Sequence, residues 1–222
     1  MTFSAIIFDM DGLLVDSEPI WYEVEIGLIE AQGYTYADEV RDATVGLRVD
    51  EFARIIHKHY PKVGASPEAV AQAVMDGMTK VPREKLHPRP GAEAIIDYVA
   101  QQQIPCAIAS SSSQVIIEHF VEILGWKDKI PQRYSAEFME RGKPAPDIYL
   151  HTAHQLGLQP QQCLALEDSR AGTQAALAAG MTCYTVPDLS HSKISDFDGI
   201  NDKIYDSLFD VLEEFKTKGL FA

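Results

Sequence analysis

The chain has 222 residues, more than one domain of common size and fewer than two full ones, so we expect a core domain with a modest insertion. Hydrophobic residues make up 46% and charged residues 23%, as in globular proteins, and no apolar run approaches the roughly 18 residues of a membrane span. The formal net charge of −14 argues against nucleic acids and anionic membranes as partners.

The three cysteines are odd in number, lie far apart in the sequence and have apolar neighbours. They are therefore expected to be buried free thiols in a reducing compartment, rather than parts of a disulfide or a zinc site. The first residues lack a basic segment followed by an apolar one, so no secretion signal is expected. We expect a cytoplasmic protein and, as the default, a monomer.

The first predicted element is a strand over residues 3–8, a continuously apolar run typical of a strand buried on both faces. The residues that follow it are Asp9-Met10-Asp11-Gly12, and Gly12 permits a sharp turn. Asp9 and Asp11 are thus expected at the carboxyl end of a buried strand, where open α/β sheets bind their ligands. A solvated Asp-Gly turn is the alternative, but a hairpin would need a second alternating strand at once.

Residues from about Pro19 to Leu86 show helical patterning and no convincing strand. Three helices are expected here, near residues 19–31, 52–60 and 67–78, the last with Ser66-Pro67-Glu68 as its start signal. We expect residues 17–86 to form a helical cap domain, inserted into a core domain made of residues 1–16 and 87–222.

After the cap, strands alternate with helices, which predicts an α/β fold with a doubly wound, mostly parallel sheet. The expected strands cover residues 104–109, 133–135, 163–166 and 182–186, and the expected helices lie near 91–102, 114–124, 146–156, 170–179 and 207–216. The segment from Asp188 to Asp202 is polar and weakly patterned, so a surface loop is expected there.

Further polar groups follow the expected strands. Glu167-Asp168 directly follows one of them, as Asp9 and Asp11 follow the first. The alternative is that these acidic residues only stabilise the N-terminus of the next helix. Another strand leads into the run Ser110 to Ser113, whose hydroxyl and N–H groups can bind an anion or cap a helix. Lys143 lies between a glycine and a proline before an expected helix; a lone lysine is more often a solvated surface group.

The segment from Asp9 to Glu18 closely resembles the first motif of the haloacid dehalogenase superfamily of phosphotransferases. Ser110, Lys143 and Glu167-Asp168 resemble its second, third and fourth motifs in order, so the resemblance spans nearly the whole chain. It implies a Rossmann-like core with a small helical cap. It also implies that Asp9 is the nucleophile and forms an aspartyl-phosphate, and that Asp11 is the general acid/base.

The same resemblance gives the remaining site residues their roles. Ser110 and Ser111 would bind the phosphoryl group, and Lys143 would neutralise the carboxylates and hold a phosphoryl oxygen. Mg²⁺ would be held by the carboxylates of Asp9 and Asp168 and by the backbone carbonyl of Asp11, an oxygen set that suits this cation. Glu167 would hold a metal-bound water or orient Lys143.

The expected cap also indicates which class of substrate is bound. Thr44 to Arg48 resembles the cap loop that reaches the core site in related sugar phosphatases, so Arg48 is expected to contact a phosphate or a sugar hydroxyl of the substrate. The alternative is a solvated arginine at the start of a helix. A small mobile cap admits small molecules, so the expected partner is a small phosphorylated metabolite: a sugar or polyol monophosphate such as a hexose or hexitol phosphate.

Three other functions are weighed against hydrolysis. Phosphomutases of the β-phosphoglucomutase type resemble the chain but carry a histidine in the helix after the first motif. Here the corresponding position falls at or beside Trp21, and no histidine lies nearby. Dehalogenases use a single aspartate on carbon and need neither Mg²⁺ nor a second acid, so Asp11, Glu167 and Asp168 argue against them. A catalytically silent binding or regulatory protein would not need every group of the reaction, and all are present.

Overall fold

The computed structural model describes residues 2–190 and 192–221. Within them, a five-stranded sheet has the strand order β3-β2-β1-β4-β5, and every neighbouring pair is parallel. The strands are β1 (Ala5–Phe8), β2 (Cys106–Ser110), β3 (Gln132–Ser135), β4 (Cys163–Glu167) and β5 (Thr182–Thr185). The predicted α/β fold with a doubly wound parallel sheet is confirmed.

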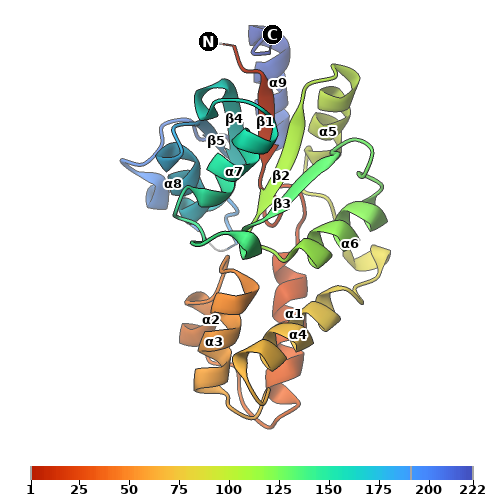
Figure 1. Cartoon of the computed structure of the whole chain (residues 1–222), viewed down its shortest axis with the longest axis vertical. Helices are drawn as coiled ribbons and strands as arrows, with labels where there is room; N and C mark the ends of the chain where they lie inside the picture. The colour runs from red at the N-terminus through yellow and green to blue at the C-terminus, as the bar shows by residue number, and fades with distance from the viewer. Residues whose placement is uncertain (1, 191, 222) are drawn as a thin grey trace.

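Helices cover both faces of this sheet (Figure 1). One face packs against α5 (Ala92–Gln101), α6 (Gln114–Leu124) and α9 (Leu208–Lys218), and the other against α7 (Asp147–Gln155) and α8 (Arg170–Ala178). Short 3-10 turns fill some of the connections: η1 (Arg83–Lys85), η2 (Ala136–Phe138), η3 (Pro160–Gln162) and η4 (Ile194–Phe197).

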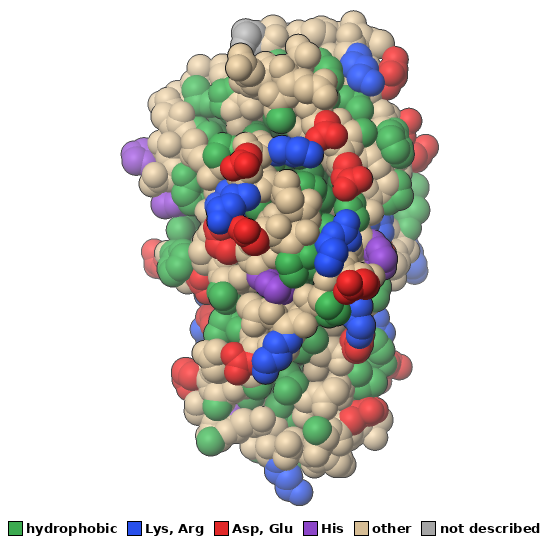
Figure 2. Space-filling model, turned by 90° about the vertical axis from the view of Figure 1, so that its right-hand side faces the viewer, with side chains coloured by type: hydrophobic (Ala, Val, Ile, Leu, Met, Phe, Trp, Pro, Cys, Tyr) green, Lys and Arg blue, Asp and Glu red, His purple; other side chains and the backbone are tan. Residues whose placement is uncertain are grey.

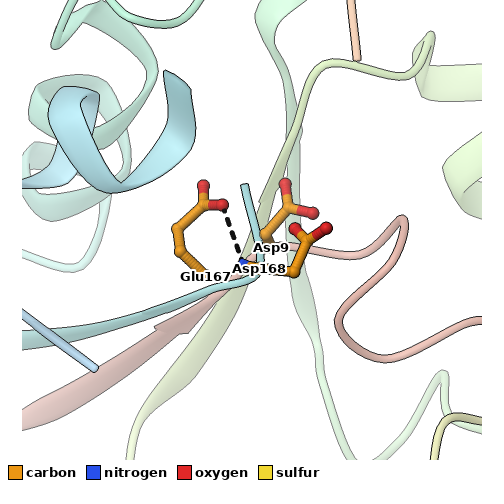
Figure 3. A group of neighbouring side chains, drawn as sticks. All are labelled: Asp9, Glu167 and Asp168. Carbon is orange, nitrogen blue, oxygen red and sulfur yellow. Dashed lines mark hydrogen bonds between the residues drawn. The ribbon is translucent and has the colours of Figure 1, made fainter. Parts of the chain in front are cut away.

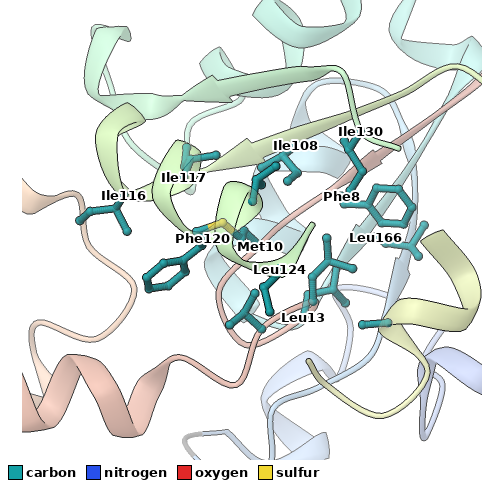
Figure 4. Packing of buried hydrophobic residues seen from close by; sticks show 14 of the residues in the cluster. Phe8, Met10, Leu13, Ile108, Ile116, Ile117, Phe120, Leu124, Ile130 and Leu166 are labelled. Atoms are coloured by element: carbon teal, nitrogen blue, oxygen red, sulfur yellow. The ribbon is translucent and has the colours of Figure 1, made fainter. Parts of the chain in front are cut away.

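The central strand β1 explains why the sequence run is apolar without alternation. Successive side chains of a strand point to opposite faces. Ile6 and Phe8 join the cluster under α5, α6 and α9, whereas Ala5 and Ile7 join the cluster under α7 and α8, and all four are 0% exposed. Figure 4 shows Phe8 in the first of these clusters, with side chains of β2, β4 and α6 around it.

A separate group of helices lies at the carboxyl ends of the strands, on the side of the sheet opposite both termini (Figure 1). These are α1 (Glu18–Glu30), α2 (Asp38–Asp42), α3 (Val49–His59) and α4 (Pro67–Met78). The two chain segments that lead to them run side by side, because the Asp16 N–H donates to the carbonyl of His87 at 2.9 Å. The sequence patterns predicted α1, α3 and α4; α2 was not predicted, since it buries no residue.

The segment after β5 was predicted to be a surface loop, and this is wrong in part. Phe197 ends η4 and is 0% exposed, and the amide of Asn201 donates to the Thr185 hydroxyl at 2.9 Å. One aromatic residue in a polar stretch produces no periodicity, so the pattern gave no sign of this packing. The three cysteines are free and buried, as predicted.

Charged side chains are mixed on the surface. On the face shown in Figure 2, lysines and arginines lie among aspartates and glutamates over both the sheet domain and the helical part. Across the described residues, none of the helices has the length and apolar character needed to cross a bilayer.

Candidate active site

The strand order brings the two acidic segments together. β1 and β4 are neighbours at the point where the order of the strands reverses direction, and such a point is where α/β sheets bind ligands. Phe8 pairs with Leu166, and the Asp9 N–H donates to the Leu166 carbonyl at 2.9 Å. In Figure 3 the Asp9 and Asp168 carboxylates lie beside one another, and one ligand oxygen from each of Asp9, Glu167 and Asp168 lies within 4.8 Å of the others.

Lys143 is the basic group of this cluster. Its Nζ donates to Asp9 Oδ1 at 2.5 Å, to Glu167 Oε1 at 2.7 Å and to the Ala109 carbonyl at 3.1 Å. Its side chain is 5% exposed, and the Tyr149 hydroxyl donates to the same oxygen of Glu167. Glu167 therefore orients Lys143, which is one of the two roles predicted for it.

The charges of the cluster do not balance. Burial raises the pKa of Asp9 and of Asp168 above the usual range, and Lys143 opposes that shift at both carboxyls. Burial lowers the pKa of Lys143, but the Asp9 and Glu167 carboxylates outweigh it, so the net shift is upward and the ammonium stays protonated. Three buried carboxyl groups thus face one ammonium, an arrangement that a further cation would stabilise.

The donor set fits a divalent cation. Asp9 and Asp168 offer carboxylate oxygens, the ligand type that Mg²⁺ prefers. The turn after Asp9 approaches Asp168 very closely: a Cβ on Gly12 would lie 2.2 Å from Asp168 Oδ2, and the φ of Gly12 is +78°. Only glycine allows this approach, so the backbone of the acidic turn and the Asp168 carboxylate share one small space.

The second aspartate points toward a different set of partners. Asp11 Oδ1 accepts hydrogen bonds from Ser17 Oγ at 2.7 Å and from Trp21 Nε1 at 3.1 Å. Its Oδ2 accepts from Ser110 Oγ at 3.1 Å and from Ser112 Oγ at 2.8 Å. Four donors therefore hold the Asp11 side chain between the loop after β2 and the start of α1.

The loop from Ser110 to Ser113 is held in place by its own hydrogen bonds. The Ser112 N–H donates to Ser110 Oγ at 3.0 Å, and the Ser112 carbonyl accepts from Ser135 Oγ at 2.6 Å, so the loop is fixed to β3. Ser111 lines the adjacent cavity. Ser113 stands at the N-cap position of α6, but its buried Oγ has no hydrogen-bond partner among the described residues, so the expected capping bond is not formed.

A cavity of about 520 Å³ lies over the strand ends, a volume typical of small-molecule sites. Its core side carries the catalytic candidates and its other side is made by α1 and the segment that precedes α3. The predicted site residues that line it are Asp9, Asp11, Ser110, Ser111, Lys143 and Asp168.

The family model of haloacid dehalogenase-like hydrolases matches residues 6–186. The chain belongs to this family. "Hexitol phosphatase B" of Escherichia coli strain K12 is 34% identical over 185 residues, which cover 82% of this chain and 83% of the relative. A "Probable pseudouridine-5'-phosphatase" of Drosophila melanogaster is 32% identical over 198 residues, covering 85% and 84%.

Among solved structures, β-phosphoglucomutase from Clostridium difficile has a TM-score of 0.78 over 98% of this chain and 99% of that one, at 22% identity, which establishes a common fold. Both of the sequence relatives reported above are named as phosphatases, and this hydrolase is accordingly a phosphoric monoester hydrolase.

Arg48 of the hydrolase is not among the residues that line the cavity. Its guanidinium donates to the carbonyls of Met139 at 2.8 Å and Ala136 at 3.3 Å, and pairs with Asp50 at 3.1 Å. Arg48 is 8% exposed, so the alternative of a solvated arginine is wrong. In this structure it joins the helical part to the core, and its contact with a substrate stays a prediction.

Several site residues of the hydrolase were not predicted from the sequence. Tyr149 binds Glu167, and Ser17, Trp21 and Ser112 bind Asp11. A tyrosine on an amphipathic helix gives no sequence sign of a carboxylate partner. Ser112 could have been included with its neighbours, because all residues of a loop at a helix start approach the same point.

Proposed function

We propose that this hydrolase is a Mg²⁺-dependent phosphatase of small sugar or polyol monophosphates, including hexose and hexitol phosphates. The observation that carries the proposal is the position of Asp9 at the base of the cavity, beside Asp168 and in contact with Lys143. Two sequence relatives support the substrate class, since one is named for a hexitol phosphate and the other for pseudouridine 5'-phosphate, which contains a sugar.

Asp9, Asp168 and the backbone carbonyl of Asp11 are the residues that would hold Mg²⁺. When bound, the ion supplies positive charge to the phosphoryl oxygens and offsets the buried carboxylates. The remaining chemistry belongs to side chains of the chain itself.

In the first half of the reaction, an Asp9 oxygen forms a bond to phosphorus as the bond from phosphorus to the leaving oxygen breaks. Asp11 gives its proton to that leaving oxygen, which departs as an alcohol. In the second half, Asp11 takes a proton from water while the water oxygen attacks phosphorus and Asp9 is released. Lys143, Ser110 and Ser111 hold the phosphoryl oxygens in both halves.

Residues 17–86 are proposed to act as the cap domain, and residues 1–16 and 87–222 as the core. Closure of the cap would exclude bulk water while the phosphoryl group is on Asp9. The protein is further proposed to be a cytoplasmic monomer whose partner is the phosphorylated small molecule.

Trp21 favours hydrolysis over phosphomutase activity. An indole Nε1–H can only donate a hydrogen bond, whereas an imidazole can also accept or carry a proton. Trp21 donates to Asp11 at 3.1 Å, so this residue can position the carboxyl but cannot exchange a proton with it. Incubation with β-glucose 1-phosphate and a trace of the bisphosphate should release inorganic phosphate; glucose 6-phosphate as the main product would instead show a mutase.

The direct test compares the wild type with Asp9→Asn. Release of inorganic phosphate from sorbitol 6-phosphate and from p-nitrophenyl phosphate in Mg²⁺ should be abolished by this nearly isosteric change, while the circular dichroism spectrum and melting temperature show an intact fold. Phosphate release that persists in Asp9→Asn would disprove the proposed nucleophile. Full activity of the wild type in excess chelator would disprove the metal dependence.

A further inference from the structure

The side of the cavity away from the strand ends has residues that phosphoryl transfer does not use. Glu18, Trp21, Tyr22 and Glu25 line the cavity from α1. Their spacing of three, one and three residues puts them on one face of a helix. Arg41, at the end of α2, lines the cavity from the same domain.

Arg41 offers hydrogen-bond donors to this cavity. Its guanidinium carbon lies 4.5 Å from the centre of the Tyr22 ring, an arrangement that orients the planar group. In the part of the chain that the structure describes, the guanidinium takes part in no hydrogen bond and no ion pair. A guanidinium has five N–H donors, so Arg41 can bind more than one oxygen of a ligand.

Glu25 offers a fixed acceptor beside it. Glu25 Oε2 accepts a hydrogen bond from the Tyr36 hydroxyl at 2.9 Å, and that hydroxyl lies 3.2 Å from Thr44 Oγ1. Tyr36 is 8% exposed and Thr44 is 5% exposed, so a buried network holds the carboxyl in place. Glu25 and Arg41 both line the cavity and form no ion pair with each other within 4.0 Å, so each keeps hydrogen-bonding capacity for a ligand.

We propose that Arg41 and Glu25 form a polyol subsite, which binds adjacent hydroxyl groups at the end of the substrate away from its phosphate. Arg41 donates to one hydroxyl oxygen and Glu25 accepts from a neighbouring hydroxyl. This assignment rests on the proposed function, because it presumes that the phosphate is bound at Asp9.

The charge of the same wall selects against a second anionic group. Glu18, Glu25 and Asp42 line it together with Arg41, and burial raises the pKa of Glu18 to about 8 and that of Glu25 to about 7, so negative charge is already unfavourable on this wall. A hydroxyl can pair with either kind of group, whereas a second phosphate or a carboxylate would meet the acidic ones unfavourably. The preferred substrate is therefore a monophosphate with a neutral, hydroxyl-rich distal end.

Kinetics with a long and a short substrate test the subsite. Arg41→Leu and Glu25→Ala should lower kcat/KM for sorbitol 6-phosphate by about 10- to 100-fold each, since each removes a charged hydrogen-bond partner. Most of the loss should appear in KM. Both variants should keep kcat/KM for p-nitrophenyl phosphate, which has no distal hydroxyls, within about twofold of wild type.

The matched control is Arg54→Leu, because Arg54 is on α3 with its side chain 59% exposed and outside the cavity lining. It should leave both substrates unaffected. Equal losses on the two substrates for Arg41→Leu and Glu25→Ala would overturn the subsite. A wild-type preference for hexose bisphosphates that disappears in Arg41→Leu would also overturn it, since Arg41 would then bind a second phosphate.

A binding measurement separates this inference from the proposed function. Calorimetric titration of Asp9→Asn with sorbitol 6-phosphate in Mg²⁺ requires no turnover. Weaker binding when Arg41→Leu is added supports the subsite, even if the wild type releases no phosphate and the proposed function fails. Binding that is independent of Arg41 contradicts the subsite, even if hydrolysis is confirmed.

Discussion

Replacement of Lys143 by methionine tests the electrostatics of the site. The change removes an ammonium that contacts both Asp9 and Glu167, and keeps an unbranched apolar side chain in its place. The Lys143 side chain is 5% exposed, that of Asp9 8% and that of Glu167 0%, so the carboxyl groups would be left buried without their partner.

The cost can be estimated from this burial. Removal of one member of a buried ion pair destabilises a protein by about 3–5 kcal/mol, because the remaining charge is neither solvated nor paired. In a protein of this size each kcal/mol lowers the melting temperature by roughly 2–4 °C, so a decrease of roughly 6–20 °C is expected in metal-free buffer. Phosphate release should be lost as well.

Thermal and urea unfolding followed by circular dichroism, in chelator at neutral pH, measure this effect. The control is Lys129→Met, since Lys129 pairs with Asp97 at 2.6 Å where the two side chains are 40% and 47% exposed. Such a surface pair contributes about 0–1 kcal/mol. If Lys143→Met were no less stable than Lys129→Met, the argument that Lys143 stabilises the buried carboxylates would be refuted.

Two further outcomes follow from the same structure. Asp11→Asn should lower kcat by about 100-fold or more, because in the proposed reaction one carboxyl is the acid of the first half and the base of the second. Both half-reactions should slow in rapid-quench experiments, and a near-normal kcat would exclude that role. Burial raises the pKa of Cys106 and of Cys163 to about 11, and also raises that of Cys183. Ellman's reagent should therefore titrate no thiol in the native protein and three in urea, whereas rapid reaction before unfolding would show that a cysteine is accessible.

The core of the site could be predicted because it depends on local patterns and one topological rule. An apolar run followed by carboxylates predicts a strand that ends just before Asp9, and the same pattern places Asp168 after β4. Parallel strands bring their carboxyl ends to one edge of the sheet, so two residues far apart in the sequence were expected to meet. The register of Phe8 with Leu166 is what makes them neighbours.

The rest depends on how separate elements pack, which periodicity does not encode. The carbonyl partners of Arg48 are 88 and 91 residues further along the chain, and they are reached only because the helical part rests on the loop after β3. Tyr149 contacts Glu167 from a helix on one face of the sheet. Trp21 was noted only for the histidine it replaces, and its bond to Asp11 follows from the position of α1.

The net charge of −14 opposes the binding of an anionic substrate, and the composition of the site resolves this difficulty. An acidic protein repels phosphate on average but attracts divalent cations, whose concentration rises near its carboxylates. Under the proposed function, the carboxyls of Asp9 and Asp168 would bind such a cation beside Lys143, and the local potential around Asp9 would then be positive. Acidic residues would thus have two opposite effects on a phosphate. Those spread over the surface repel it, whereas those at the ends of β1 and β4 would bind the cation that attracts it.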